Sequence, residues 1–594
     1  MINSGDLATF TVKVGGSEVP DTMRIYAVRV EKRMNRISYA KITILDGEAD
    51  DGDFAASSSD TFAPGGELTV EAGYDGTNKV IYSGIITRQG LRIDNINGSM
   101  LEVECRDKAI KMVVGRKCLT FSKKKDSDII SSIIGNYSGI SPEVTPTTTV
   151  WPEQVQYYVS DWDFILSRAE ANGLVVTAMD GKVSVVKPNA TTSSVLTVGY
   201  GNGLLEFSAD LNCVTQLGTV KASSWDFITQ AVISGQATND TPGPGNLSSK
   251  KLSEIVGPST YQLQTTAPLA SGDLTNWSKA QLIKSEYAKI IGEAKFQGTG
   301  DVSPGNYITL QGLGSRFNGD HLVSGVVHDI SDGNWTTEAA IGLSPLWFTE
   351  EPDVMAPPAS GLLPGVRGLL NGTVKQMCKD PDSQLRILVT VPMFDLNGDG
   401  IWARLANFYS TSTAGGFFMP EVGDEVILGF LNEDPRYPII LGSMYSSSKL
   451  KPFTGLDPNQ DNSIKAIVSK SGISMEYNDK DIILTIATPA KNTFVLSDKE
   501  SKITLTDVNL NSIEMSARGI TIKSPKTITF QADEKVVIKG TQGIQVQSSG
   551  GDVETTGINI KETADSQYSA EGSMMAKINS GTELTLKSAM IMIN

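Results

Sequence analysis

The segment from Asp395 to Gly400 places oxygen-bearing side chains at alternate positions, Asp395, Asn397 and Asp399, directly before a glycine. This order opens the calcium-binding loop of an EF-hand, which needs a bidentate glutamate at its twelfth position. The twelfth position here is Ala406, and no helix is predicted on either side. Because Asn-Gly and Asp-Gly favour tight turns, we expect a hairpin turn rather than a calcium site.

The chain contains two histidines, His321 and His328, in a segment with strand-like alternation. With a carboxylate such as Asp320 they could bind a metal, but structural histidines are the more common case in strands. A serine hydrolase would need a Gly-x-Ser-x-Gly elbow, which is absent. Adjacent carboxylates at 350–351 and 533–534 lack the apolar setting that would raise one pKa for acid catalysis. We therefore predict no catalytic, cofactor-binding or metal-binding residues, and no enzyme.

Residues 243–251, Gly-Pro-Gly-Asn-Leu-Ser-Ser-Lys-Lys, have a faint likeness to a phosphate-binding loop. They lack the Gly-Lys-Ser/Thr order that such loops require, and the prolines predict a flexible, disordered loop. The net charge of −16 also opposes binding to a nucleic-acid backbone, which requires clustered Lys and Arg. We therefore expect no nucleic-acid partner.

The composition indicates a mainly β protein with several domains. The chain has 594 residues, with 57 glycines, 25 prolines and only 7% aromatic residues, which is typical of strands joined by many turns. Its four cysteines form no Cys-x-x-Cys pair, so we expect reduced and mostly buried thiols. The N-terminus has neither a basic region nor an apolar core, and no long apolar run occurs. We expect assembly in the cytoplasm without a signal peptide or a spanning helix.

Prolines mark the clearest domain boundary, at residues 351–365, which we interpret as a linker. The region before it, residues 1–350, is rich in predicted strands. It also contains three predicted helices, at 126–136, 160–172 and 276–295, in which apolar side chains recur at helical spacing. The second helix begins with Ser-x-x-Asp and stops at a glycine, which is typical of helix boundaries.

Residues 366–446 contain short strands separated by turn-forming sequences. The surest of these strands lie at residues 386–391, 401–408, 425–430 and 439–441. Their number and spacing favour a small five-stranded barrel of the OB type. A second linker, at residues 447–462, leads to a C-terminal region of residues 463–594.

The C-terminal region repeats one pattern, in which two apolar residues flank a third position and a polar break follows. The apolar pairs begin at residues 473, 484, 494, 503, 513, 520, 528, 536, 544, 558 and 584. Each strand buries only two or three side chains, so stability must come from stacking, as in a β-solenoid or β-prism. From Ile520 through Ile528 and Val536 to Ile544 the step is eight residues each time. The repeat weakens after Val546, where we expect the rod to be irregular.

The barrel segment contains three distinctive blocks: Trp-Ala-Arg at 402–404, Gly-Phe-Phe-Met-Pro-Glu-Val-Gly-Asp-Glu-Val at 416–426, and Asp-Pro-Arg-Tyr-Pro-Ile-Ile-Leu-Gly-Ser at 434–443. In their order and spacing these blocks resemble the OB-fold domain of VgrG spike proteins. Upstream, Asn-Arg-Ile-Ser-Tyr-Ala at 35–40 and Trp-Asp-Phe at 162–164 are similar to the tail-hub protein of contractile phages. The resemblance covers nearly the whole chain, in the order hub, OB domain and needle.

The resemblance implies a mainly β fold: a hub of two β-barrel domains with inserted helices, an OB-fold barrel and a C-terminal triple-stranded β-helix. It implies a homotrimer that serves as the structural spike of a contractile injection machine. The spike links the inner tube and baseplate to a membrane-puncturing needle, and contraction delivers it outside the cell or into a target cell. The expected partners are the other two copies, an inner tube protein, baseplate proteins, effectors and a PAAR-type tip protein. No cofactor is expected.

The chain ends on the largely apolar residues Met590, Ile591, Met592, Ile593 and Asn594. A frayed tail is one interpretation of this segment. Three copies would instead form an exposed apolar platform of the kind that marks an interaction surface. With the resemblance, these five residues are predicted to contact the tip protein.

Two other classes of protein stay open. An effector-bearing cell-wall hydrolase would need an appended domain or a converging nucleophile and base, and the sequence indicates neither. An adhesive tail fibre would end in a receptor-binding head, whereas this chain ends on the repeats. A type VI apparatus, an extracellular injection particle and a phage are all compatible with the resemblance.

Overall fold

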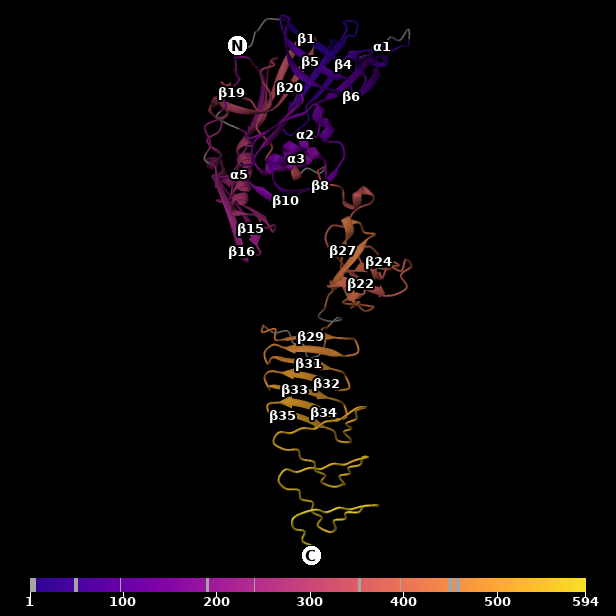
Figure 1. Cartoon of the computed structure of the whole chain (residues 1–594). Helices are drawn as coiled ribbons and strands as arrows, with labels where there is room; N and C mark the ends of the chain where they lie inside the picture. The colour runs from indigo at the N-terminus through magenta and orange to yellow at the C-terminus, as the bar shows by residue number, and fades with distance from the viewer. Residues whose placement is uncertain are drawn as a thin grey trace. The chain divides into compact units, whose positions relative to one another are not determined.

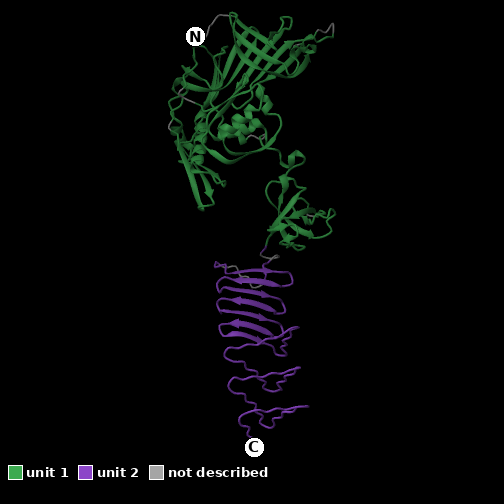
Figure 2. Ribbon diagram, in the orientation of Figure 1, with its two compact units in different colours: residues 1–444 green, residues 445–594 purple. Residues whose placement is uncertain are grey.

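The computed structural model describes residues 7–47, 52–96, 98–188, 192–239, 241–350, 354–395, 397–446, 451–453 and 460–593. The chain divides into two compact units, residues 1–444 and residues 445–594 (Figure 2). Strands dominate the first unit and the upper part of the second (Figure 1), so the predicted mainly β fold is confirmed. Among the described residues, no helix has the length and apolar character needed to cross a membrane.

The first unit is built on one sheet of 13 strands. Its strands are β1 (Ala8–Val14), β2 (Ser17–Glu18), β3 (Ile25–Arg33), β4 (Tyr39–Leu45), β5 (Glu67–Tyr74), β6 (Thr77–Asp94), β7 (Gly98–Arg106), β13 (Leu196–Gly199), β14 (Leu204–Leu211), β18 (Ile290–Gln297), β19 (Tyr307–Gln311), β20 (Gly319–Ser331) and β21 (Asn334–Ile341). Antiparallel pairing of β3 with β20 joins the N-terminal strands to those after residue 196. Two hydrophobic cores pack on this sheet: one combines N-terminal strands with Ile330 and Trp335, and the other is built from residues after 196. The division into two barrel subdomains stays a prediction.

Period-two alternation explains how each half buries one face of this sheet. In β5, Leu68, Val70 and Ala72 are buried in the first core, whereas Thr69 and Glu71 between them are half-buried. Side chains alternate across a strand, so a sequence of this kind forms a sheet with one dry face.

Helices α2 (Asp126–Gly135) and α3 (Asp161–Ala171) confirm two of the predicted helices. They share a third core with neighbouring strands. The strands around these helices are β8 (Lys117–Lys125), β9 (Ser141–Val144), β10 (Val150–Val159), β11 (Val175–Met179) and β12 (Lys182–Val186). Ser160 caps α3, since its hydroxyl oxygen accepts a 3.1 Å hydrogen bond from the Asp163 N–H.

The third predicted helix, at residues 276–295, is wrong in its second half. Helix α5 (Ser271–Tyr287) ends before Ile290, and the chain continues as strand β18. Ile290, Ala294 and Phe296 are buried in the core of the large sheet. Because Ile290 and Ala294 also fit helical spacing, short-range periodicity could not separate the helix from the strand that follows it.

A small three-stranded sheet packs against α5. Its strands are β15 (Thr219–Asp226), β16 (Ala231–Thr238) and β17 (Tyr261–Thr265), and helix α4 (Ser249–Val256) lies between β16 and β17 in the chain. The core here is formed by Leu217, Val220 and Leu282.

The expectation of a disordered loop at residues 243–251 is wrong. The buried Lys289 ammonium donates hydrogen bonds of 2.6 to 3.0 Å to the carbonyl oxygens of Pro242, Pro244 and Leu247. All three ammonium donors are therefore occupied by the loop backbone, although burial lowers the Lys289 pKa to about 8. Helix α4 follows, with Ser248 as its N-cap.

The predicted OB barrel is confirmed as a closed five-stranded barrel in the order β22-β23-β24-β28-β27. Its strands are β22 (Leu370–Gln376), β23 (Ile387–Thr390), β24 (Ile401–Leu405), β27 (Glu425–Phe430) and β28 (Pro438–Ser443). A short hairpin of β25 (Ser410–Thr411) and β26 (Ala414–Gly415) projects from it. Part of each predicted linker, residues 351–353, 447–450 and 454–459, lies outside the described residues.

The second unit begins with a seven-stranded antiparallel meander. Its strands are β29 (Ile464–Val468), β30 (Ser474–Asn478), β31 (Ile483–Ala487), β32 (Thr493–Ser497), β33 (Lys502–Thr506), β34 (Ser512–Ser516) and β35 (Gly519–Lys523). Each strand pairs with the next along the chain, so the sheet is a stack of short transverse strands (Figure 1). Residues 524–593 contain no strand.

All four cysteines are free thiols, but the expectation that they are mostly buried is wrong. Cys105 is buried and Cys213 is half-buried, whereas Cys118 and Cys378 are exposed.

Candidate functional site

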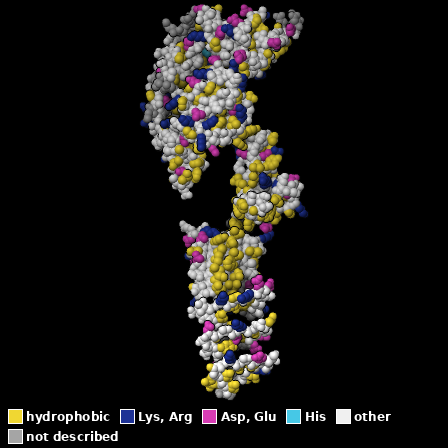
Figure 3. Space-filling view, in the orientation of Figure 1, with side chains coloured by type: hydrophobic (Ala, Val, Ile, Leu, Met, Phe, Trp, Pro, Cys, Tyr) yellow, Lys and Arg dark blue, Asp and Glu magenta, His cyan; other side chains and the backbone are white. Residues whose placement is uncertain are grey.

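The needle sheet has one apolar face, on which side chains from successive strands stand directly opposite one another. One row joins Phe494 to Leu505 and Leu505 to Ile513, and a parallel row joins Leu496 to Ile503. In full, the two rows are Ile467, Met475, Ile486, Phe494, Leu505, Ile513 and Ile522, and Tyr477, Leu484, Leu496, Ile503, Met515 and Ile520. Figure 3 shows hydrophobic side chains gathered as a strip on this sheet.

These two rows are not covered in the single chain. A groove of about 580 Å³ runs along the first row, between its side chains and the adjoining hairpin turns. Leu505, Ile520 and Ile522 are 49%, 68% and 47% exposed. Positions between the rows, such as Thr485 and Glu514, lie on the opposite, more polar face. An apolar strip of this length on a folded chain marks an interaction surface.

The repeat shortens its step from β35 onward, one strand before the strand pairing stops. Strands β30 to β34 begin at Ser474, Ile483, Thr493, Lys502 and Ser512, at intervals of nine or ten residues. Such an interval holds a five-residue strand and a turn that reverses the chain, so consecutive strands pair as hairpins. The predicted strands that follow at eight-residue steps have no strand partner among the residues that the structure describes, and every described residue from 525 to 593 is exposed.

The predicted tip-contact residues are exposed at the end of this segment. Met590, Ile591, Met592 and Ile593 are 73%, 51%, 82% and 85% exposed. Asn594 lies outside the described residues.

The two histidines both lie in β20 and are buried. A ring nitrogen of His321 lies 2.7 Å from the Phe317 carbonyl oxygen, and one of His328 lies 3.0 Å from the Thr337 hydroxyl oxygen. Burial lowers the pKa of both rings, to about 3 for His328. The part of the chain that the structure describes holds no group of three or more metal-ligating side chains.

The Asp395 segment joins the antiparallel strands β23 and β24. The Asp395 carboxylate accepts a 2.9 Å hydrogen bond from the Asn397 N–H, as in a turn. The Lys375 ammonium donates to the carbonyl oxygens of Gly398 and Asp399, at 3.2 and 3.0 Å. A lysine therefore already supplies the positive charge at this loop.

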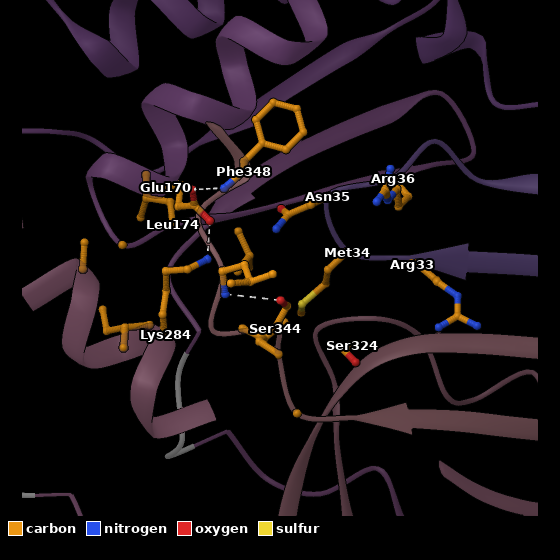
Figure 4. A pocket seen from close by; sticks show the side chains of 17 residues that line it. Arg33, Met34, Asn35, Arg36, Glu170, Leu174, Lys284, Ser324, Ser344 and Phe348 are labelled. Atoms are coloured by element: carbon orange, nitrogen blue, oxygen red, sulfur yellow. Dashed lines mark hydrogen bonds and ion pairs between the residues drawn. The ribbon is translucent and has the colours of Figure 1, made fainter. Parts of the chain in front are cut away.

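A cavity of about 350 Å³ lies beside α3, α5 and the segment after β21 (Figure 4). The Glu170 carboxylate forms an ion pair with Lys284 and accepts a 2.7 Å hydrogen bond from the Phe348 N–H. Trp347 donates its indole N–H to the Gln281 side chain at 2.7 Å, and its ring lies 5.4 Å from the Lys284 ammonium. These groups tie residues 347–348 to both helices. The lining residues that the structure describes include neither histidine nor cysteine.

Sequence reasoning missed this bracing cluster, because its members are far apart in the chain. Glu170 and Phe348 are separated by 178 residues, and Glu170 and Lys284 by 114. The signal available in the sequence was a carboxylate on the mostly apolar stripe of a helix, since a buried carboxylate requires a partner.

Two family models match the chain. A model described as the Type VI secretion system/phage-baseplate injector OB domain matches residues 370–445, the segment that forms the closed barrel. The closed barrel and this match identify residues 370–445 as an OB domain of the kind found in injectors of type VI secretion systems and phage baseplates. The model of a family described as the Alg8 N-terminal domain matches residues 4–332, more than half of the chain. The chain belongs to this family.

Curated relatives include spike proteins of type VI secretion systems. Spike protein VgrG3 of Vibrio cholerae is 42% identical over 52 residues, which cover 9% of this chain and 5% of that protein. Spike protein VgrG1b of Pseudomonas aeruginosa is 28% identical over 102 residues, 17% of this chain and 14% of that protein. The matched stretches are thus a small part of these relatives. With the OB domain match, they confirm the resemblance to VgrG spike proteins.

Solved structures of low sequence identity also align with the chain. The 43 kDa tail protein of prophage MuSo2 from Shewanella oneidensis aligns with a TM-score of 0.43 and 12% identity, over 57% of this chain and 98% of that one. The c3393 protein of E. coli, a type VI secretion component, aligns with a TM-score of 0.38 and 11% identity, over 73% of this chain and 99% of that one.

Proposed function

We propose that this chain is the structural spike of a contractile injection machine and that it works as a homotrimer. The proposal rests on the C-terminal needle, where one face of the sheet is an uncovered apolar strip. The strands predicted beyond Lys523 also have no partner among the residues that the structure describes. Two further copies would supply both the cover and the partners.

In this trimer the two parts of the needle assemble differently. Over β29 to β35 each copy forms its own sheet, and three sheets turn their apolar faces toward a common axis. Beyond Lys523 the eight-residue repeats of three copies alternate, so each strand pairs with strands from the other two. This is the triple-stranded β-helix that the resemblance implies.

The physical properties of such a needle suit puncturing rather than catalysis. Compression along the axis must break many ladder hydrogen bonds together, and strand edges remain only at the two ends. The hub and OB domains would connect this needle to the inner tube and baseplate proteins. Contraction would deliver the spike, with effectors and a PAAR-type tip protein, out of the cell or into a target.

We infer that the chain itself is not an enzyme. The relatives VgrG3 and VgrG1b are named spike proteins. Glu170 and Lys284, in the cavity beside α3 and α5, are engaged in bracing contacts. One relative is named an actin cross-linking toxin, but it matches over only 53 residues, 5% of that protein.

The molar mass of the full chain in solution tests the trimer. We expect light scattering to give three times the chain mass of 63.5 kDa. A mass equal to one chain would refute the proposal, because a lone chain would leave the apolar strip in water.

Removal of the last five residues tests the tip contact. A chain that ends at Ala589 should keep its trimer mass and lose co-purification with a PAAR-type tip protein. Replacement of exposed Lys587 by Ala provides a control that keeps the apolar residues. Unchanged recovery of the tip protein with the shortened chain would exclude this segment as its docking site.

A further inference from the structure

The hairpin of β15 and β16 carries uncovered apolar residues at its tip. Phe227 and Ile228, in the turn, are 64% and 80% exposed. Trp225 and Val232 stand opposite each other in the two strands and are 45% and 67% exposed. We call these four residues the apolar tip.

Three other hairpin turns of the first unit have a different composition. The β5–β6, β11–β12 and β20–β21 turns each contain an Asp-Gly pair, at 75–76, 180–181 and 332–333. Asp and Gly tolerate positive φ and remain solvated in turns. Turn geometry therefore does not require Phe227 and Ile228, which expose a large apolar surface instead.

The turn is held in one conformation by its first residue. The Asp226 carboxylate accepts hydrogen bonds from the Ile228 N–H at 3.0 Å and from the Thr229 hydroxyl at 2.7 Å. These bonds, first that of Thr229, lower the pKa of Asp226. Gln230 closes the turn with φ of 50°. A preformed tip loses little conformational entropy when it binds, as expected of an anchor.

The base of the hairpin is fixed to α5. The Ser278 hydroxyl accepts a hydrogen bond from the Ala222 N–H at 3.1 Å and donates to the Gly235 carbonyl oxygen at 3.2 Å. Gly235 allows close contact, since a Cβ atom there would lie 2.3 Å from the Thr275 nitrogen. The hairpin is therefore a supported arm.

A second uncovered surface lies on the OB domain, beside the β25–β26 hairpin. Phe408, Tyr409, Phe417 and Phe418 are 84%, 54%, 72% and 63% exposed, and we call them the aromatic patch. The Phe408 ring lies against Gly416, where a Cβ atom would be 2.4 Å from it. Aromatic residues grouped on a surface are the usual energetic centre of a protein interface.

We propose that the apolar tip of one copy packs on the aromatic patch of a second copy of this chain, a contact that rests on the homotrimer proposed above. One chain carries both halves of the contact, and neither is covered in the single chain. A contact between two different surfaces of identical chains closes into a ring when each copy is rotated by the same angle. Three copies around a needle axis meet this condition, at high effective concentration.

Charge argues against a membrane as the occupant of the apolar tip. Over residues 219–238 the only charged side chains are Lys221 and Asp226, and Asp226 is the one at the turn. Protein segments that bind anionic lipid surfaces carry several Lys or Arg beside their apolar residues. A protein surface rich in aromatic side chains is the better match.

A photo-crosslinker at the tip tests the contact in the full chain. In the variant Phe227→p-benzoylphenylalanine, we expect irradiation to give a band of two crosslinked chains, with the link mapped to residues 408–418. The same substitution at exposed Asn334, beside the β20–β21 turn, should give none. A trimer mass with no link between chains, or links only to lipid or to another protein, would overturn the contact. A monomer mass would instead refute the homotrimer.

Paired substitutions provide a second measurement. Phe227→Ser with Ile228→Ser, and Phe417→Ser with Phe418→Ser, should each lower the denaturant concentration at which the trimer dissociates. The combination of all four should lower it no further than the stronger pair, because both pairs remove one contact. Fully additive effects would overturn the proposal.

Discussion

Asp126 is the residue on which several elements of the hub converge. Its carboxylate accepts hydrogen bonds from the Arg168 guanidinium at 2.8 and 2.9 Å, from the Trp151 indole at 3.0 Å and from the Asn172 amide at 2.9 Å. The side chain is 1% exposed. Burial alone would raise its pKa, but the hydrogen bonds and charge of Arg168 and the neighbouring donors hold it below its ordinary value. Asp126 therefore joins α2, α3 and β10 as an ionised group.

Substitution of this residue should destabilise the hub strongly. Asp126→Asn leaves the half-buried Arg168 charge without its partner, and we expect a loss of about 3–5 kcal/mol of unfolding free energy. Tryptophan fluorescence in a denaturant titration measures it, since Trp151 belongs to the cluster. Asp301→Asn breaks the exposed Lys79–Asp301 pair and should cost no more than about 1 kcal/mol. Equal losses in the two variants would contradict this account.

At the scale of elements, the sequence pattern correctly predicted the helices whose boundaries depend on interactions within the helix itself. Residues 126–136 and 160–172 form α2 and α3, because a capping serine and an apolar stripe act within one helix. The boundary between α5 and β18 was missed, since it depends on contacts with a distant strand. Gly292 of β18 must approach Ser208, where a Cβ atom would lie 2.2 Å from the carbonyl oxygen. Nothing in the sequence near Gly292 specifies that neighbour.

Gly235 of β16 is a second glycine at which a larger side chain would collide with a neighbouring element. Gly235→Ala would force β16 away from α5 at Thr275, and we expect a loss of about 1–3 kcal/mol. Gly90→Ala in β6 is the matched control, since no atom lies within 4 Å of its added Cβ. Thermal denaturation of both variants compares them. A loss at Gly90 as large as that at Gly235 would show that strand flexibility, rather than close packing, decides the effect.

At the scale of the whole molecule, the sequence located the repeats but not the place where their pairing changes. The apolar pairs look alike on both sides of Lys523, and only the step shortens, from nine or ten residues over β30 to β34 to seven at β35 and then to eight as far as Ile544. Long-range hydrogen bonds such as that between Glu170 and Phe348 could not be predicted either, because a single sequence does not indicate which distant segments lie close together in the fold.

Hydrogen exchange should separate the two parts of the needle. In the assembled protein we expect slow exchange of backbone amides over both residues 464–523 and residues 524–593. When the copies are separated by mild denaturant, residues 524–593 should exchange fast while strands β31 to β34 stay protected, because those strands pair on both sides with strands of their own chain. Mass spectrometry of peptides reads this out. If both parts lost protection at the same denaturant concentration, the proposal that β29 to β35 pair within one chain and the later repeats pair between chains would be refuted.

The absence of strand partners beyond Lys523 has a genetic consequence in the proposed trimer. If one copy lacks these repeats, the repeats of the two intact copies lose their strand partners from that copy, and neither intact copy can supply the missing strands. One shortened copy is then enough to spoil an assembly that contains two intact ones. Expressed beside the normal gene, such a truncation should behave as dominant rather than recessive.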